Sequence, residues 1–164
     1  MLADGQLQVR ALAQSVNNAE VVRLDWLPVE VTYSVPDILV SPTSYGFGSV
    51  AEGATPASGL TCFTVTNNSS FAVNITINGS DMTGGDTWTL SDNASQGANI
   101  YGLRAGLAGD YTIIVKKNSP YNTLVSNLAA SGGTQQWGLK LYAPTMFSDG
   151  VGKTGTVTLT AATL

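Results

Sequence analysis

The sequence predicts an all-β fold, namely a single antiparallel β-sandwich preceded by an N-terminal extended arm. Short runs in which apolar and polar residues alternate recur along the chain, and a period of two is typical of strands with one buried face. Clusters of Gly, Asn, Ser and Asp separate these runs and supply the turn residues that antiparallel strands need. About seven to nine short strands without a long helical pattern are typical of a sandwich.

The arm is predicted to comprise residues 1–28. Within it, residues 20–27 (EVVRLDWL) alternate as a strand does, and Pro28 ends the run. The apolar residues on one face of this run are Val22, Leu24 and Trp26. The preceding residues 6–16 (QLQVRALAQSV) fit a strand and a helix equally well, so their conformation stays open.

The sandwich is predicted to occupy residues 29–164. Its expected strands are residues 29–35, 60–67, 71–77, 86–90, 99–103, 110–115, 135–142 and 155–162. The expected inward residues are Phe71, Val73, Ile75 and Ile77 in one run, and Trp137, Leu139, Leu141, Val157 and Leu159 in the last two runs. Thr and Val are favoured here because branched side chains pack well on a pleated surface. Residues 122–130 (NTLVSNLAA) are interpreted instead as one or two helical turns.

Charge and hydropathy exclude two classes of partner. The chain has 7 Lys and Arg residues against 11 Asp and Glu residues, and Lys116–Lys117 is its only adjacent basic pair. Because binding through phosphates needs several clustered basic side chains, no nucleic acid is expected as a partner. No apolar run approaches the roughly 18 residues that a membrane-spanning helix needs, so no membrane insertion is expected either.

The surface is expected to be solvated by hydroxyl and amide groups rather than by ions. Charged residues make up 11% of the chain, which is less than half of their usual share. Such a surface is common outside cells and on particles, so we expect a virion-surface or extracellular location and not a cytoplasmic one. The first residues, MLADGQLQVRALAQSVNNAE, lack the basic and apolar regions of a secretory signal peptide, which favours release as part of a virus particle.

The chain contains no histidine. This absence removes the Ser–His–Asp and Cys–His arrangements, histidine metal ligands and the usual general base. Cys62 is the only cysteine, so neither an intramolecular disulfide nor a cysteine-based zinc site can form, and its strand pattern indicates a small buried hydrophobe. The acidic residues are scattered among turns rather than paired for glycoside hydrolysis. We therefore expect no enzymatic activity and no cofactor, with Ca²⁺ as the one exception considered below.

Residues 45–79 (YGFGSVAEGATPASGLTCFTVTNNSSFAVNITING) resemble the bacterial immunoglobulin-like domains of the ASH and related surface-repeat type. The residues that carry the resemblance are Phe47, Gly48, Val50, Gly53, Phe63, Val65, Asn67, Val73 and Ile75. It implies an immunoglobulin-like sandwich in which Phe47 and Val50 plug one end and Asn67 caps a strand by bonding nearby backbone. Residues 137–161 resemble the final hairpin of such domains, which serve adhesion, spacing and assembly.

Asp81, Asp86 and Asp92 are the candidate metal ligands. They lie in or beside the loop GSDMTGGD, and loop aspartates are common ligands of Ca²⁺, which takes about six to eight oxygens. Their spacing matches no known calcium loop, and Asp also stabilises turns by bonding its own backbone. A calcium site and ordinary turn chemistry therefore both stay open.

Trp88 and Tyr101 are the candidate residues for binding a surface glycan. Sugars stack on aromatic rings, and both residues adjoin predicted loops. Trp137, by contrast, alternates with leucines and is expected in the core.

The arm carries the functional prediction. A detached strand would expose its apolar face and an unpaired backbone edge to water. Placed on a neighbour's sheet edge, the same strand would add by backbone bonds while its side chains Val22, Leu24 and Trp26 fill pockets. Pairing of the arm with its own sandwich is the alternative.

We therefore expect a non-enzymatic structural subunit of a repeating extracellular assembly. The preferred assembly is a bacteriophage virion, with the chain as a decoration, capsid-accessory or tail-type protein. Its expected partners are copies of itself or a shell or tail protein of the particle. The alternatives are a secreted filament or surface-layer subunit joined by strand donation, and a carbohydrate-binding adhesion module.

Overall fold

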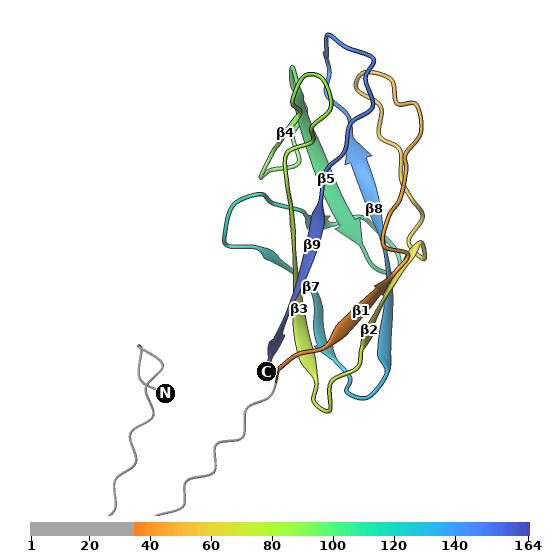
Figure 1. The fold of residues 1–164 in the computed structure, drawn as a ribbon, viewed down its shortest axis with the longest axis vertical. Coiled ribbons are helices and arrows are strands. Elements are labelled where there is room, and N and C mark those ends of the chain that lie inside the picture. Colours follow the sequence, from red (N-terminus) through yellow and green to blue (C-terminus); the bar gives the residue numbers. More distant parts are fainter. Residues whose placement is uncertain (1–34) are drawn as a thin grey trace, which may run out of the picture. The chain divides into compact units, whose positions relative to one another are not determined.

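Nine strands form two sheets in the computed structural model, which describes residues 35–164 (Figure 1). The strands are β1 (Ile38–Ser41), β2 (Phe63–Asn67), β3 (Val73–Gly79), β4 (Thr89–Leu90), β5 (Ile100–Gly106), β6 (Ile113–Ile114), β7 (Asn122–Leu128), β8 (Gly133–Tyr142) and β9 (Val157–Thr163). The expected all-β architecture is therefore confirmed. Among residues 35–164 there is no helix with the length and apolar character needed to cross a bilayer.

The two sheets differ in size and in strand direction. The larger sheet has the order β1-β2-β8-β5-β4, with β6 also paired to β5, and the smaller sheet has the order β7-β3-β9. All pairs are antiparallel except β4 and β5, which are parallel through Thr89 opposite Ile100 and Leu90 opposite Tyr101. The larger sheet is therefore mixed, which corrects the expectation of a purely antiparallel sandwich. Tight turns in the connection 91–99 return the chain to the end of the sheet where β4 began, and this makes the parallel pair possible.

The inward residues predicted from alternation form the core between the sheets. Val73, Ile75 and Ile77 on β3 are fully buried, and Trp137, Leu139 and Leu141 on β8 are buried with 2–7% of their surface exposed. The rings of Phe63 and Trp137 stack with their centroids 4.6 Å apart. Aromatic and branched side chains fill a layer between sheets efficiently, so this core accounts for the favourable burial in the fold.

Residues 122–128 form strand β7, so the helical interpretation of this segment is wrong. Leu124, Val125 and Leu128 are the buried residues, and this spacing imitates one face of a helix. The cause is an irregular register with β3, where the pairing shifts between Val73 and Thr76. Asn127 takes a positive φ of 53° and donates its N–H to the side chain of Asn74 across 2.9 Å, as a β-bulge requires.

The expected closing hairpin is also wrong. β8 pairs with β2 and β5 in the larger sheet, whereas β9 pairs with β3 in the smaller sheet. The connection 143–156 therefore crosses from one sheet to the other. Thr163 at the end of β9 lies opposite Val73, so β9 forms one edge of the smaller sheet.

The entrance to β1 is fixed at the same end of the fold. The N–H of Asp37 donates to Ser69 Oγ across 2.8 Å, and the main-chain oxygen of Asp37 accepts from the N–H of Asn68 across 2.9 Å. The turn between β2 and β3 thus holds the residue that precedes β1, close to the end of β9 (Figure 1). β1 then runs away from this end along the edge of the larger sheet.

Candidate binding groove

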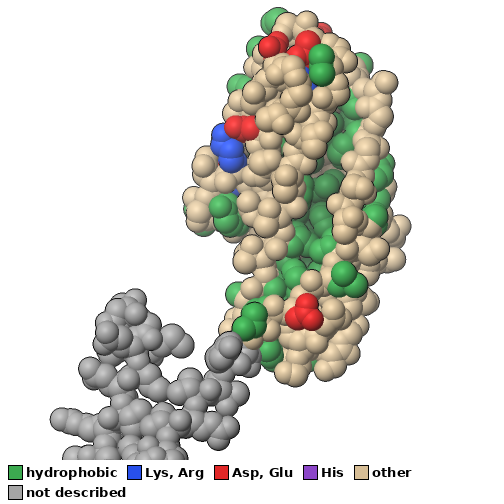
Figure 2. Space-filling view, viewed as in Figure 1, with side chains coloured by type: hydrophobic (Ala, Val, Ile, Leu, Met, Phe, Trp, Pro, Cys, Tyr) green, Lys and Arg blue, Asp and Glu red, His purple; other side chains and the backbone are tan. Residues whose placement is uncertain are grey.

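An apolar groove of about 990 Å³ lies between the free edge of β9 and the β1 edge of the larger sheet. Figure 2 shows hydrophobic side chains along its floor, between two ridges of backbone and other side chains. The floor comes from the larger sheet and includes Phe63, Leu103, Trp137, Leu139 and Leu141. The walls include Ile38 and Val40 from β1, and Val157 and Leu159 from β9.

The groove exists because the smaller sheet does not cover the larger one. Three strands face a sheet whose main path has five. On β3, in the middle of the smaller sheet, the inward side chains are fully buried, but Val157 and Leu159 on the edge strand β9 are only half-buried. Apolar surface that faces water costs free energy in proportion to its area, so this edge is a place where covering the groove would stabilise the protein.

The loop after β1 forms one rim of the groove. Tyr45 packs edge-on against Phe47 and Phe63, with ring centroids 5.1 Å and 6.0 Å apart. Gly48 has a φ of +69°, a conformation that glycine adopts without strain. Phe47 and Val50 pack partly buried against the core, which agrees with the plugging role that the resemblance implied for them.

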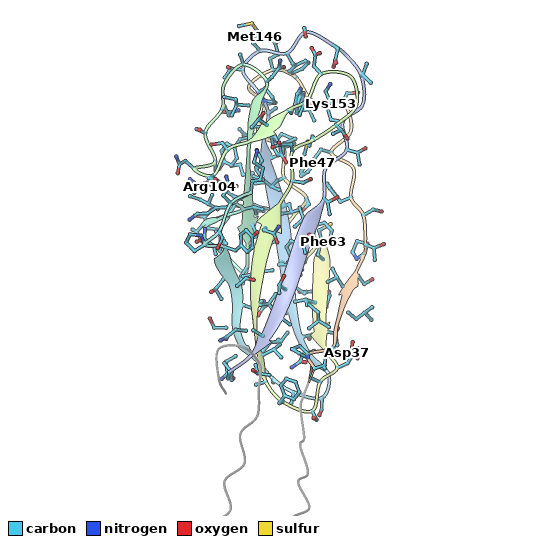
Figure 3. All side chains as sticks on the ribbon, turned by 60° about the vertical axis from the view of Figure 1, so that its left-hand side comes forward. Asp37, Phe47, Phe63, Arg104, Met146 and Lys153 are labelled. Atoms are coloured by element: carbon cyan, nitrogen blue, oxygen red, sulfur yellow. The ribbon has the colours of Figure 1, made fainter. Side chains whose placement is uncertain are left out.

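A charged cluster closes one end of the groove. Lys153 Nζ lies 2.6 Å from Asp149 Oδ1, with its side chain 5% exposed, and lies 5.9 Å from the ring centroid of Trp88. The hydrogen bond from Lys153 lowers the pKa of the Asp149 carboxyl below its usual value, and the main-chain N–H of Asp86 lowers it further. Figure 3 shows Lys153, Phe47 and Phe63 following one another in this order along the long axis of the fold.

Two buried indole N–H groups stand among the residues that line the groove. Trp88 and Trp137 both contribute to the lining, and neither Nε1 atom has a hydrogen-bond partner within residues 35–164. A buried donor without an acceptor is costly.

The three predicted metal ligands are not gathered into one site. Asp81 accepts from the Leu90 N–H at 2.9 Å and from Lys117 Nζ at 3.1 Å. Asp92 accepts from Asn118 Nδ2 at 2.7 Å and from the main-chain N–H of the same Lys117 at 2.6 Å. Asp86 contacts Ser148 instead. In the described part of the chain no group of three or more acidic, His or Cys residues could hold a metal ion.

The pKa values of the Asp81 and Asp92 carboxyls are lowered by the groups that bond to them. Burial raises the pKa of Asp81, but the Leu90 N–H and the Lys117 ammonium lower it by more, so the net pKa lies below the usual value. For Asp92, the Asn118 side chain and N–H lower the pKa most, and the Lys117 N–H adds to this. The hydrogen bonds of these aspartates in and beside the loop GSDMTGGD therefore support turn chemistry, one of the two interpretations that the sequence left open.

The two predicted glycan-binding residues are buried. Trp88 is 6% exposed and Tyr101 is 1% exposed. The Tyr101 hydroxyl donates to the main-chain oxygen of Ser80, and burial followed by the nearby Asp81 charge raises its pKa. Because both rings are buried, neither offers a free face to a sugar.

The predicted arm residues Val22, Leu24 and Trp26 lie outside the described residues, as does the predicted boundary at residue 28. Sequence reasoning missed the groove itself, although it identified Val157 and Leu159 as inward residues. Alternation shows which side chains face inwards, but it does not show that β9 lies at an edge beside β1. The short run ILVS between two prolines was the available signal for β1.

Neither the family models, nor the curated proteins, nor the solved structures contain a match to this chain.

Proposed function

We propose that this chain is a non-enzymatic structural subunit of a repeating extracellular assembly. The observation that carries the proposal is the apolar groove of about 990 Å³ along the edge of an otherwise polar, ion-poor domain. Concave sites lined by hydrophobic side chains are a common form of binding site in proteins. A groove that runs between two sheet edges suits an extended polypeptide better than a compact small molecule.

A bacteriophage particle is the first candidate for the assembly, with the chain as a decoration, capsid-accessory or tail-type protein. The surface supports this, because it relies on hydroxyl and amide groups and charged residues make up 11% of the chain. The lack of histidine in the chain supports a structural rather than a catalytic role. The buried positions of Trp88 and Tyr101 remove the specific support for a carbohydrate-binding module.

A pair of variants on one strand tests the proposal. Leu159→Asp places a charge in the groove wall, whereas Thr160→Asp places the same charge on the exposed opposite face of β9. We expect the full-length parent and Thr160→Asp to elute well above the chain mass of 17.0 kDa in size exclusion with light scattering. Leu159→Asp should elute at the mass of one chain, and circular dichroism should show that its β structure is retained.

Electron microscopy of the same samples separates the two kinds of assembly. Closed, discrete oligomers support a subunit of a particle, and open filaments support the secreted filament, because an interface that closes on itself makes rings and one that does not makes fibres. A parent chain that stays at 17.0 kDa at all concentrations would contradict the proposal. Normal assembly of folded Leu159→Asp would show that the groove is not the contact.

A further inference from the structure

Resting on the proposed function, we infer that the groove is the acceptor site for residues 20–27 of a second copy of the chain, which add to the free edge of β9. β9 is the longer of the two strands that flank the groove, with seven residues against four in β1. The segment EVVRLDWL has eight residues, so its length matches that of β9. An added strand would extend the smaller sheet towards β1 and cover the floor.

The backbone of β9 offers the bonds that strand addition requires. The Ser80 N–H donates to Thr156 O across 3.0 Å, whereas the neighbouring Gly79 N–H donates away from β9, to Lys116 O across 3.0 Å. Because bonded pairs alternate along an antiparallel ladder, the N–H and C=O groups of Val157, Leu159 and Ala161 point away from β3. They face the groove, and within residues 35–164 β9 has no second neighbouring strand.

The side chains of the segment fit the chemistry of the groove. In residues 20–27, every second residue from Val22 to Trp26 is apolar, and Arg23 and Asp25 lie between them. A strand beside β9 would therefore turn Val22, Leu24 and Trp26 to the floor formed by Phe63, Leu139 and other apolar residues, and turn the charged residues to solvent. A shift of one residue would bury the charges instead, so the pattern also sets the register.

The sequence between the segment and β1 favours a second copy over the chain's own groove. β1 is entered at Asp37, which is held at the turn between β2 and β3, and it runs from there along the groove. To lie in its own groove, the segment would have to turn back on β1 within residues 28–36. Pro28, Ser34 and Pro36 are turn-compatible residues at the two ends of this stretch, PVEVTYSVP, but its middle (residues 29–33) is rich in β-branched residues and includes no Gly, Asn or Asp, which favours extended chain there.

Disulfide trapping between two differently substituted chains tests this inference. All chains carry Cys62→Ala, so that only introduced thiols can pair. One full-length chain carries Leu24→Cys, and the other carries a single cysteine at Val157, Leu159 or Ala161, which covers three registers two residues apart. After mixing and mild oxidation, we expect a covalent dimer of two chains from at least one of these combinations. Directly opposite residues on paired strands lie within reach of a disulfide.

Arg23→Cys is the matched control for Leu24→Cys. It lies one residue away on the opposite face of the same predicted strand, so it should give no mixed dimer with the same three partners. Equal trapping of Arg23→Cys and Leu24→Cys would overturn the inference, because it would show contact without a defined face.

The outcomes also separate this inference from the proposed function. If the Cys62→Ala parent assembles but a chain with both cysteines forms only an internal disulfide, the segment fills its own groove, and the inference fails while the assembly role stands. If the parent is a single chain of 17.0 kDa and no mixed dimer forms, both fail.

Discussion

The side-chain amide of Asn67, at the end of β2, donates a hydrogen bond to the main-chain oxygen of Leu128, at the end of β7, across 3.1 Å. These two strands belong to different sheets. The same amide nitrogen also donates to Phe71 O and Ala129 O, and its oxygen accepts from the Ser69 N–H at 3.0 Å. One fully buried side chain therefore joins the two sheets at the end of the fold where β1 begins.

Replacement of this side chain should destabilise the whole domain. Asn67→Ala leaves three main-chain oxygens without this donor, and we expect the free energy of unfolding to fall by about 3 kcal/mol. The measurement is urea unfolding followed by tryptophan fluorescence. Asn68→Ala is the control, because Asn68 is exposed and uses its main-chain N–H, and it should change the stability by less than about 0.5 kcal/mol. Equal effects of the two substitutions would contradict the role assigned to Asn67.

The role of Asn67 shows how much of the fold the sequence could predict. Asn67 was expected to bond nearby backbone, and the alternation in residues 71–77 identified buried Val73, Ile75 and Ile77. Both are local signals that depend on a few neighbouring residues. The bulge in β7 and the crossing of the chain between β8 and β9 depend on pairing between distant residues, which a single sequence does not reveal.

Gly85 is a second position where a small substitution should have a large effect. It has a φ of +63°, and a Cβ atom there would overlap the carboxylate of Asp149. We expect Gly85→Ala to lower the free energy of unfolding by about 1–2 kcal/mol, because Ala is strained at this φ and the carboxylate at the end of the Asp149 side chain must shift. Gly53→Ala is the control, since its φ is +68° but no atom lies within 4 Å of the added Cβ. If thermal unfolding shows that Gly53→Ala lowers the stability as much as Gly85→Ala, the contact between Gly85 and the Asp149 carboxylate contributes nothing.

The loop carboxylates should make the domain sensitive to acid. The pKa of Asp92 is lowered by Asn118 and Lys117, so folding is stabilised by its ionised form above the unfolded pKa of about 3.9. This stabilisation is lost as the pH falls through the folded pKa. We expect the urea midpoint to fall below about pH 4, and Asp92→Asn to flatten this fall while lowering the midpoint at pH 7. The pH dependence of the urea midpoint of Asn118→Ala should lie between those of the parent and Asp92→Asn. Identical pH profiles for all three proteins would contradict the assignment.

Trp88 should behave as a core residue rather than as a ligand-binding residue. It is 6% exposed, and its ring centroid lies 5.1 Å from that of Phe147. We expect Trp88→Ala to cost about 3–5 kcal/mol of stability, and Trp88→Phe to cost less because most of the ring volume is kept. Thermal unfolding measures both, and a Trp88→Ala variant as stable as the parent would contradict the burial.

The candidate sites show what local patterns miss. Asp81, Asp86 and Asp92 are close in sequence, but Asp86 contacts Ser148, whereas Asp81 contacts the Lys117 ammonium and Asp92 contacts Asn118 and the Lys117 N–H. The partners come from segments far along the chain, so sequence spacing alone could not decide between a metal and a set of turns. The groove was missed for the same reason, because it depends on which strand lies at the edge of each sheet.

Hydrogen exchange at β9 tests the central claim most directly. In the full-length protein, the amide groups of Val157, Leu159 and Ala161 face the groove and should be protected only when a strand from another chain bonds to them. We predict that their exchange slows as the protein concentration rises and speeds up on dilution, while the amides of Ile75 and Ile77 stay protected throughout. Fast exchange at these three residues at every concentration would contradict the account, as would slow exchange that persists in a single chain.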